Sequence, residues 1–274
     1  MEGGISRWMI VALGTCVWPA AASMGAELPV TAGLELRLDA ASFANRRLGS
    51  AVSEWPDTSG NQRHATGGSG GAIYGEVQTP SGLYAVSFHD VCDEAMSFCY
   101  NPNGRDITVI GVARSRLEAS VWPYYFRGFI GWREVAGETP LALGSFNITQ
   151  TVVALSGYGE AGLNTVIVAT HVPATGFTVD TARLNSTTGV LDVFRNKRPL
   201  GQLSGIKQTI QGAAPCGFIG GLGACDGLGW AGELAEVLVY SRALTDAERE
   251  AVESYLHDKW LLAFKAYNPN PADE

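Results

Sequence analysis

The sequence carries little charge and lacks any run of basic residues. Charged residues make up 17% of the 274, and the formal net charge at pH 7 is −8. Nucleic acids and anionic membrane surfaces are bound through clustered Lys and Arg side chains, so this charge argues against both as the main partner. The hydrophobic content of 46% is enough for a sizeable core and argues against a disordered chain.

The sequence also lacks the motifs of several enzyme classes in the context that they need. The G-x-S-x-G pattern at Gly67–Gly71 and the G-x-G-x-x-G pattern at Gly227–Gly232 do not join a predicted strand to a predicted helix. We therefore interpret neither as a nucleophile elbow or a phosphate-binding glycine loop. The sequence also has no E-x-D-x-E motif, which on a strand would place the carboxylates of a retaining glycosidase on one face. Glu233 and Glu236 are three residues apart, which predicts opposite faces of a strand unless a β-bulge lies between them.

Histidine is scarce, and its four copies are scattered along the chain. A polysaccharide lyase would need a His or Tyr base beside a carboxylate, and no such grouping is visible. Asp90, Asp93 and Glu94 lie close together, but we interpret them as a solvated acidic turn. We therefore predict no catalytic residues and interpret the chain as a binding protein, with an enzyme as the alternative.

The first 26 residues resemble an export leader. Arg7 precedes an apolar stretch from Trp8 to Val17, and small residues offer cleavage sites after Ala22 or Ala26. We expect a signal peptide at 1–26, and hence a secreted, periplasmic or cell-surface protein.

Two alternatives to a cleaved leader stay open. An uncleaved anchor would be the only contact with a membrane, although the apolar stretch is short for a span of about 20 residues. A lipoprotein attached at Cys16 is the other alternative. After the leader we expect one laminin-G-like domain over 27–264 and a polar tail over 265–274.

Removal of the leader leaves four of the five cysteines. An even number in an exported chain favours disulfides, and three pairings are possible. We expect Cys92–Cys99 and Cys216–Cys225, because each pair would close a short loop. A zinc site is the alternative, but neither pair has the C-x₂₋₄-C spacing.

Most of the chain is predicted to consist of short strands separated by glycine-rich turns. Leu34–Leu38 and Tyr84–Phe88 alternate between apolar and polar residues, and Ile107–Ala113 is almost entirely apolar. About a dozen such strands without intervening helices predict an all-β fold, a two-sheet antiparallel sandwich.

One amphipathic helix is predicted near the C-terminus. Thr245 and Glu248 have the T-x-x-E spacing of a capping box at its start. Apolar residues then follow at helical spacing along one stripe, namely Val252, Tyr255, Leu256 and Trp260. We expect this stripe to pack against a sheet.

Several segments together resemble the laminin-G-type domains of the concanavalin A-like lectin and glucanase superfamily. They are Leu34–Ala40, the W-x-D-x-S-G-N run Trp55–Asn61, the strand that ends at Phe88, Val193–Lys197 and the closing segment Gly232–Glu248. The resemblance implies a jelly-roll sandwich of two curved sheets. It also implies a module that binds glycans or proteins outside the cytoplasm, in a superfamily that includes sugar-cleaving enzymes.

The densest aromatic stretch offers candidate ligand-binding residues. Trp122, Tyr124, Tyr125 and Trp132, with Arg127 among them, could present aromatic faces and a planar cation to a sugar. The alternative is that most of these rings fill the core.

Asp57 and Asn61 could supply oxygen ligands to a calcium ion, the only cofactor that we consider. The alternative is that Asp57 accepts backbone N–H groups and holds the Ser59–Gly60 turn.

The sequence therefore favours an exported, non-catalytic module that binds an extracellular glycan or a surface protein. A glycan hydrolase or lyase of the same fold is one alternative, and a structural protein of the cell envelope is another.

Overall fold

The computed structural model describes residues 27–67, 71–89, 94–116, 127–134, 141–146, 150–154, 176–205, 213–221 and 229–263. The expected leader and the polar tail lie outside these residues. No helix among the described residues is long and apolar enough to cross a membrane.

The described residues form strands almost throughout. In chain order the elements are β1 (Leu34–Asp39), η1 (Ala40–Phe43), β2 (Ser50–Val52), β3 (Glu54–Trp55), β4 (Ala65–Gly67), β5 (Ala72–Gln78), β6 (Tyr84–His89), β7 (Met96–Cys99), β8 (Ile107–Ser115), β9 (Arg127–Glu134), β10 (Leu141–Phe146), β11 (Gln150–Ala154), β12 (Thr178–Asn185), β13 (Val190–Arg195), β14 (Arg198–Ser204), β15 (Ala213–Ile219), β16 (Ala231–Tyr240) and α1 (Asp246–Trp260).

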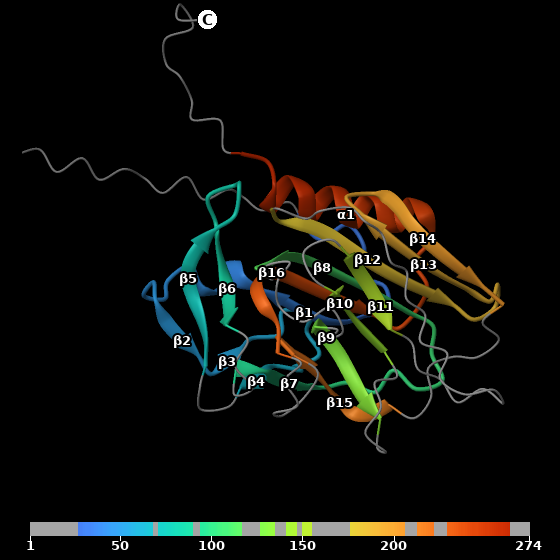
Figure 1. The fold of residues 1–274 in the computed structure, drawn as a ribbon, viewed down its shortest axis with the longest axis horizontal. Coiled ribbons are helices and arrows are strands. Elements are labelled where there is room, and N and C mark those ends of the chain that lie inside the picture. Colours follow the sequence, from blue (N-terminus) through green and yellow to red (C-terminus); the bar gives the residue numbers. More distant parts are fainter. Residues whose placement is uncertain are drawn as a thin grey trace, which may run out of the picture.

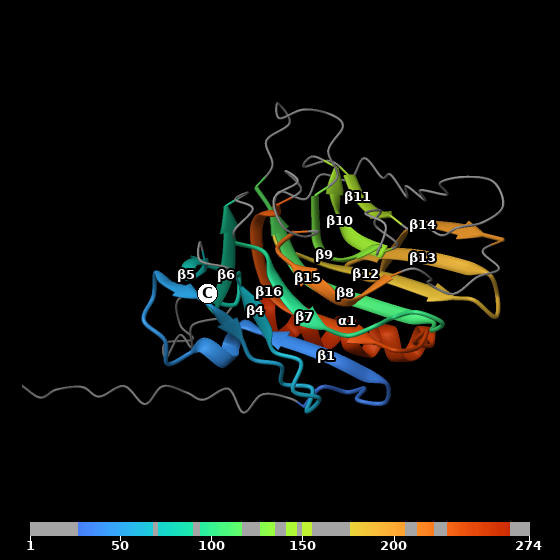
Figure 2. The same ribbon diagram turned by 90° about the horizontal axis from the view of Figure 1, so that it is seen from below.

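The strands make two antiparallel sheets. The larger sheet has nine strands in the order β14-β13-β12-β8-β16-β6-β5-β2, with β1 also paired to β16. The smaller sheet has seven, in the order β11-β10-β9-β15-β7-β4-β3. Figure 2 shows the smaller sheet on one side of the larger sheet and α1 on the other. The predicted all-β, two-sheet sandwich with one C-terminal helix is confirmed.

The core between the sheets depends on close backbone approach as well as on large side chains. Gly111 in β8 lies against Phe129 of β9, and a Cβ at Gly111 would be 2.5 Å from that ring. Glycine is needed at this position because the two sheets meet there with no room for a side chain. Phe129 is itself 1% exposed and fills the space.

Helix α1 lies on the face of the larger sheet that points away from the smaller sheet, which we call the outer face (Figures 1 and 2). Its capping box is formed as predicted, with Thr245 as N-cap and Glu248 returning a hydrogen bond to the Thr245 N–H. Val252, Leu256 and Trp260 are fully buried and Tyr255 is half-buried. The predicted apolar stripe therefore packs against the sheet.

The expected orientation of the two glutamates of β16 is wrong. A β-bulge between Leu234 and Glu236 shifts the register, so that Glu233 lies opposite Arg114 and Glu236 opposite Val112. Residues 112 and 114 of a strand share a face, so both glutamates point to the outer face. The extra residue of a bulge has no signature in the sequence here.

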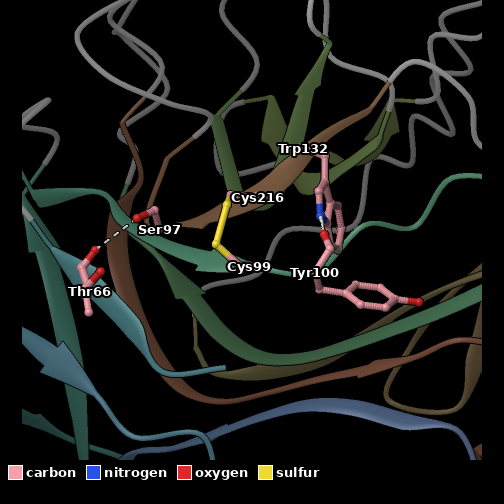
Figure 3. Close-up of a disulfide and its surroundings, with 6 residues drawn as sticks. All are labelled: Thr66, Ser97, Cys99, Tyr100, Trp132 and Cys216. Atoms are coloured by element: carbon pink, nitrogen blue, oxygen red, sulfur yellow. Dashed lines mark hydrogen bonds between the residues drawn. A yellow bond between two sulfur atoms is a disulfide. The ribbon is translucent and has the colours of Figure 1, made fainter. Parts of the chain in front are cut away.

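The expected disulfide pairs are also wrong. Cys99 of β7 is bonded to Cys216 of β15, across 117 residues of chain (Figure 3). The two cysteines are direct partners in the register of adjacent antiparallel strands. Closeness in sequence misled the prediction because sheet order, not loop length, decides which strands are neighbours. Cys92 and Cys225 lie outside the described residues.

Candidate functional site

The aromatic stretch contributes at least one ring to the core. Trp132 is fully buried in β9 and donates its indole N–H to the Tyr100 carbonyl at 2.8 Å (Figure 3). The ring also packs edge-on against Phe98. Its ring faces are therefore enclosed by the protein.

The other candidate ligand-binding residues cannot be placed in the same way. Trp122, Tyr124 and Tyr125 lie outside the described residues. The backbone of Arg127 opens β9, opposite Ser145, but its side chain lies outside the described part of the structure. A sugar-binding role for these residues stays a prediction.

The oxygens of Asp57 are occupied by hydrogen bonds from the chain. Oδ1 accepts the N–H groups of Arg37 and Ser59, both at 2.9 Å. Oδ2 accepts the Ser59 hydroxyl at 2.8 Å and the Arg63 N–H at 2.9 Å. These bonds hold the turn after β3 against β1, which is the alternative role considered for Asp57.

Asn61 also serves this turn. Its Nδ2 donates to the carbonyls of Leu34 and Glu35 at 2.9 and 3.1 Å. No group of three His, Cys, Asp or Glu that could hold a metal is found among the described residues. Calcium at Asp57 and Asn61 stays an untested prediction, and the contacts of both residues are explained without it.

Glu236 holds the end of α1 to the sheet. Its fully buried carboxylate accepts hydrogen bonds from Arg37 Nε at 2.8 Å, Lys259 Nζ at 2.6 Å and Trp260 Nε1 at 2.7 Å. Burial alone would lower the pKa of Lys259, but the charges of Glu236 and Asp39 outweigh it and raise that pKa. This carboxylate is committed to structure.

Beyond the end of α1, the outer face carries a second group of charged side chains, which we call the outer polar cluster. Its members come from β5, β6, β8, β16 and the residues beside them, namely Glu76, His89, Glu94, Arg114, Arg116 and Glu233. Apart from the buried Glu94 and Glu233, their side chains are 29–36% exposed.

Glu233 is the buried centre of one half of this cluster. Its carboxylate is 0% exposed, and Oε2 accepts a hydrogen bond from Arg114 Nε at 2.6 Å. Oε1 lies 2.7 Å from Arg116 Nε, an ion-pair contact without hydrogen-bond geometry. Arg116 also donates from Nη2 to the Phe88 carbonyl at 3.1 Å, which links β8 to β6 across β16.

His89 is the centre of the other half. Its Nδ1 lies 3.0 Å from Glu94 Oε1 and its Nε2 lies 2.8 Å from Glu76 Oε2. A neutral imidazole has one N–H and can donate to only one of these carboxylates, whereas the protonated ring satisfies both. Glu94 additionally accepts the His89 backbone N–H, so it is a buried hydrogen-bond partner and not the solvated residue that the sequence suggested.

Sequence reasoning missed this cluster for an identifiable reason. The alternation of Arg114 and Arg116 at the end of a predicted strand would have placed both on one face. Their counterion, Glu233, lies 119 residues from Arg114, and only the pairing of β8 with β16 brings them together.

One buried ion pair lies on the opposite face of the larger sheet, which faces the smaller sheet. Asp180 of β12 accepts hydrogen bonds from Arg195 Nε at 2.7 Å and Nη2 at 3.0 Å, and both residues are buried. Burial raises the pKa of Asp180, against the opposing effect of the Arg195 charge. The bidentate pair joins β12 to β13 on the inner face.

Comparison with known proteins shows the fold and not a family. No protein-family model matches the chain, and no curated protein matches it in sequence. Solved structures do match it. The binding domain of Paraclostridial Mosquitocidal Protein 1 aligns with 82% of the chain and 52% of its own length, with a TM-score of 0.59 and 14% identity.

Two further matches come from an arabinanase and a sialidase. Domain 4 of AbnA, an extracellular arabinanase of Geobacillus stearothermophilus seen in complex with arabinotriose, aligns over 81% of the chain and 98% of that domain, with a TM-score of 0.53 and 15% identity. Trypanosoma rangeli sialidase aligns over 86% of the chain but only 34% of its own length, with a TM-score of 0.52 and 16% identity. At these identities the likeness establishes a β-sandwich fold alone.

Proposed function

We propose that this chain is an exported, non-catalytic domain that binds a glycan. The observation that carries the proposal is the state of the acidic side chains on the outer face. A retaining glycosidase needs two carboxylates about 5–5.5 Å apart with access to the sugar. Glu233 and Glu236 share a face, but both are 0% exposed and neutralised by Arg or Lys.

Two further observations support the proposal. The fold is shared with the binding domain of Paraclostridial Mosquitocidal Protein 1 and with a domain of an arabinanase that was solved in complex with arabinotriose. The disulfide between β7 and β15 fits an oxidising compartment outside the cytoplasm. The resemblance of the sequence to laminin-G-type domains leads to the same class of function.

A glycan array probed with the purified protein tests the proposal, together with size analysis of each bound polysaccharide after long incubation. We expect saturable binding and no shortening of the polymer. Turnover of a polysaccharide would favour the alternative of a hydrolase or lyase. Retention on cell-envelope protein without binding to any sugar would favour the alternative of a structural envelope protein.

A further inference from the structure

Two guanidinium groups lie side by side where β8 ends on the outer face. Arg114 is in the strand and Arg116 directly follows it, so the two side chains project to the same side. Both approach Glu233 through Nε, at 2.6 and 2.7 Å. A guanidinium held at Nε by one carboxylate still has Nη–H groups to offer to another oxyanion.

The positive charge of the pair exceeds that of its counterion. Glu233 supplies one negative charge to two guanidinium groups, and its carboxylate is fully buried while the arginines are 29% and 35% exposed. Solvent and any ligand therefore meet the two cations and not the anion between them.

Arg114 has unused donors and an apolar neighbour. Among the described residues its Nη groups make no hydrogen bond, and its guanidinium lies 5.5 Å from the centroid of the Phe177 ring. The register of β12 with β8 places Phe177 beside Arg114 on the same face. An aromatic ring next to a planar cation is a surface on which the apolar face of a sugar ring can rest.

An unpaired hydroxyl lies in the same row of side chains. Ser87 of β6 is the direct cross-strand partner of Glu233, is 0% exposed, and its Oγ has no hydrogen-bond partner among the described residues. Glu76 is 36% exposed and lies next to His89 in the same cluster. Its carboxylate can accept hydrogen bonds from sugar hydroxyls.

We propose that Arg114 and Arg116 bind the carboxylate of an acidic sugar, a uronate or a sialate, with Phe177 under the sugar ring. This inference rests on the proposed glycan-binding function and specifies its ligand class. Arginine is suited to a carboxylate because its N–H groups form two parallel bonds to the two oxygens. The net charge of −8 keeps extended polyanions such as nucleic acid away. A single carboxylate can meet the half of the outer polar cluster in which Arg114 and Arg116 share Glu233, while Glu76 and Glu94 belong to the half around His89.

The test is a calorimetric titration of the full protein with matched ligands. Oligogalacturonate and sialyllactose represent the two sources of a sugar carboxylate. Methyl-esterified oligogalacturonate and lactose are their uncharged counterparts. We expect at least one acidic ligand to bind at least tenfold more tightly than its counterpart, with an affinity that falls as salt is added.

Two variants assign the binding to Arg114. Arg114→Lys keeps the charge and the ion pair with Glu233 but loses the planar guanidinium group, which can donate two parallel hydrogen bonds to a carboxylate. The double variant Arg114→Gln with Glu233→Gln keeps the net charge and leaves no buried carboxylate short of a partner. Both should weaken the acidic ligand about tenfold or more and leave the melting temperature close to that of the parent.

The matched control is Arg242→Lys. Arg242 is 31% exposed and ion-paired to Glu248, like Arg114 with Glu233, but it lies beyond the opposite end of β16. This variant should bind the acidic ligand as the parent does.

The outcomes separate the two proposals. Equal affinity for the acid and its ester, or unchanged binding in both Arg114 variants, overturns the carboxylate site and leaves glycan binding standing. A folded protein that binds no sugar overturns both.

Discussion

At the scale of single residues, Trp260 is the side chain on which the docking of α1 most depends. It is fully buried and donates to Glu236, so its removal loses apolar burial and one hydrogen bond to a buried carboxylate. Trp260→Ala should lower the free energy of unfolding in urea by roughly 3–5 kcal/mol. His257, 40% exposed on the same helix, provides the control, because His257→Ala should change it by less than about 0.5 kcal/mol. A change that small in Trp260→Ala would mean that the helix does not dock through this ring.

Glu248, at the start of the same helix, makes the stability of the folded protein depend on pH. Hydrogen bonds from Arg242, and then from Thr245, lower the pKa of its carboxyl from 4.5 to about 2. A lowered pKa in the folded state stabilises the protein above the unfolded-state value, and this contribution is lost as the pH falls from about 4.5 through 2.

Glu248→Gln removes this contribution. Urea midpoints of the parent and the variant should therefore differ at pH 6 and converge as the pH approaches 2. A difference that stays the same at both pH values would show that the stabilisation comes from shape and capping rather than from the ionised carboxyl.

At the scale of elements, the disulfide between β7 and β15 is a covalent constraint on the smaller sheet. A crosslink that closes a loop of 117 residues should stabilise the fold by about 5 kcal/mol in the chain-entropy account. Reduction, or the double variant Cys99→Ser with Cys216→Ser, should therefore lower the melting temperature. Peptide mapping of the unreduced protein should recover the Cys99–Cys216 pair, and four titratable thiols in the native protein would contradict it.

The same map should recover a second pair. Of the three pairings of the four cysteines, only one contains Cys99–Cys216, and it joins Cys92 to Cys225. The strands that flank them support this prediction, because β6 pairs with β16 and β7 with β15. Free thiols at Cys92 and Cys225 beside an intact Cys99–Cys216 bond would contradict it.

The elements also show which features the sequence could predict. The alternation in β1 and β6, the apolar run of β8 and the capping box of α1 are local patterns, and each one formed as expected. The disulfide and the shared face of Glu233 and Glu236 depend on strand order and on a bulge. Those are set by packing between distant segments, so no local pattern encodes them.

At the scale of the whole molecule, the charged side chains of the larger sheet have separate tasks on its two faces. Asp180 and Arg195 neutralise each other inside the sandwich, and Glu236 fastens α1 outside it. The outer polar cluster is different because its cations stay partly open to solvent. Part of the site predicted from the sequence lies outside the described residues. The candidate site among the described residues is the outer polar cluster, which forms only when β8, β16 and β6 pair in the folded sheet.

Glycan binding without cleavage is the central claim, and one measurement tests it most directly. The protein is titrated with the polysaccharide selected on the array, and the chain length of that polysaccharide is measured in the same sample after binding has saturated. We predict a saturable isotherm and an unchanged chain length. A shortened polymer, or a folded protein that shows no saturable binding to any glycan, would contradict the account.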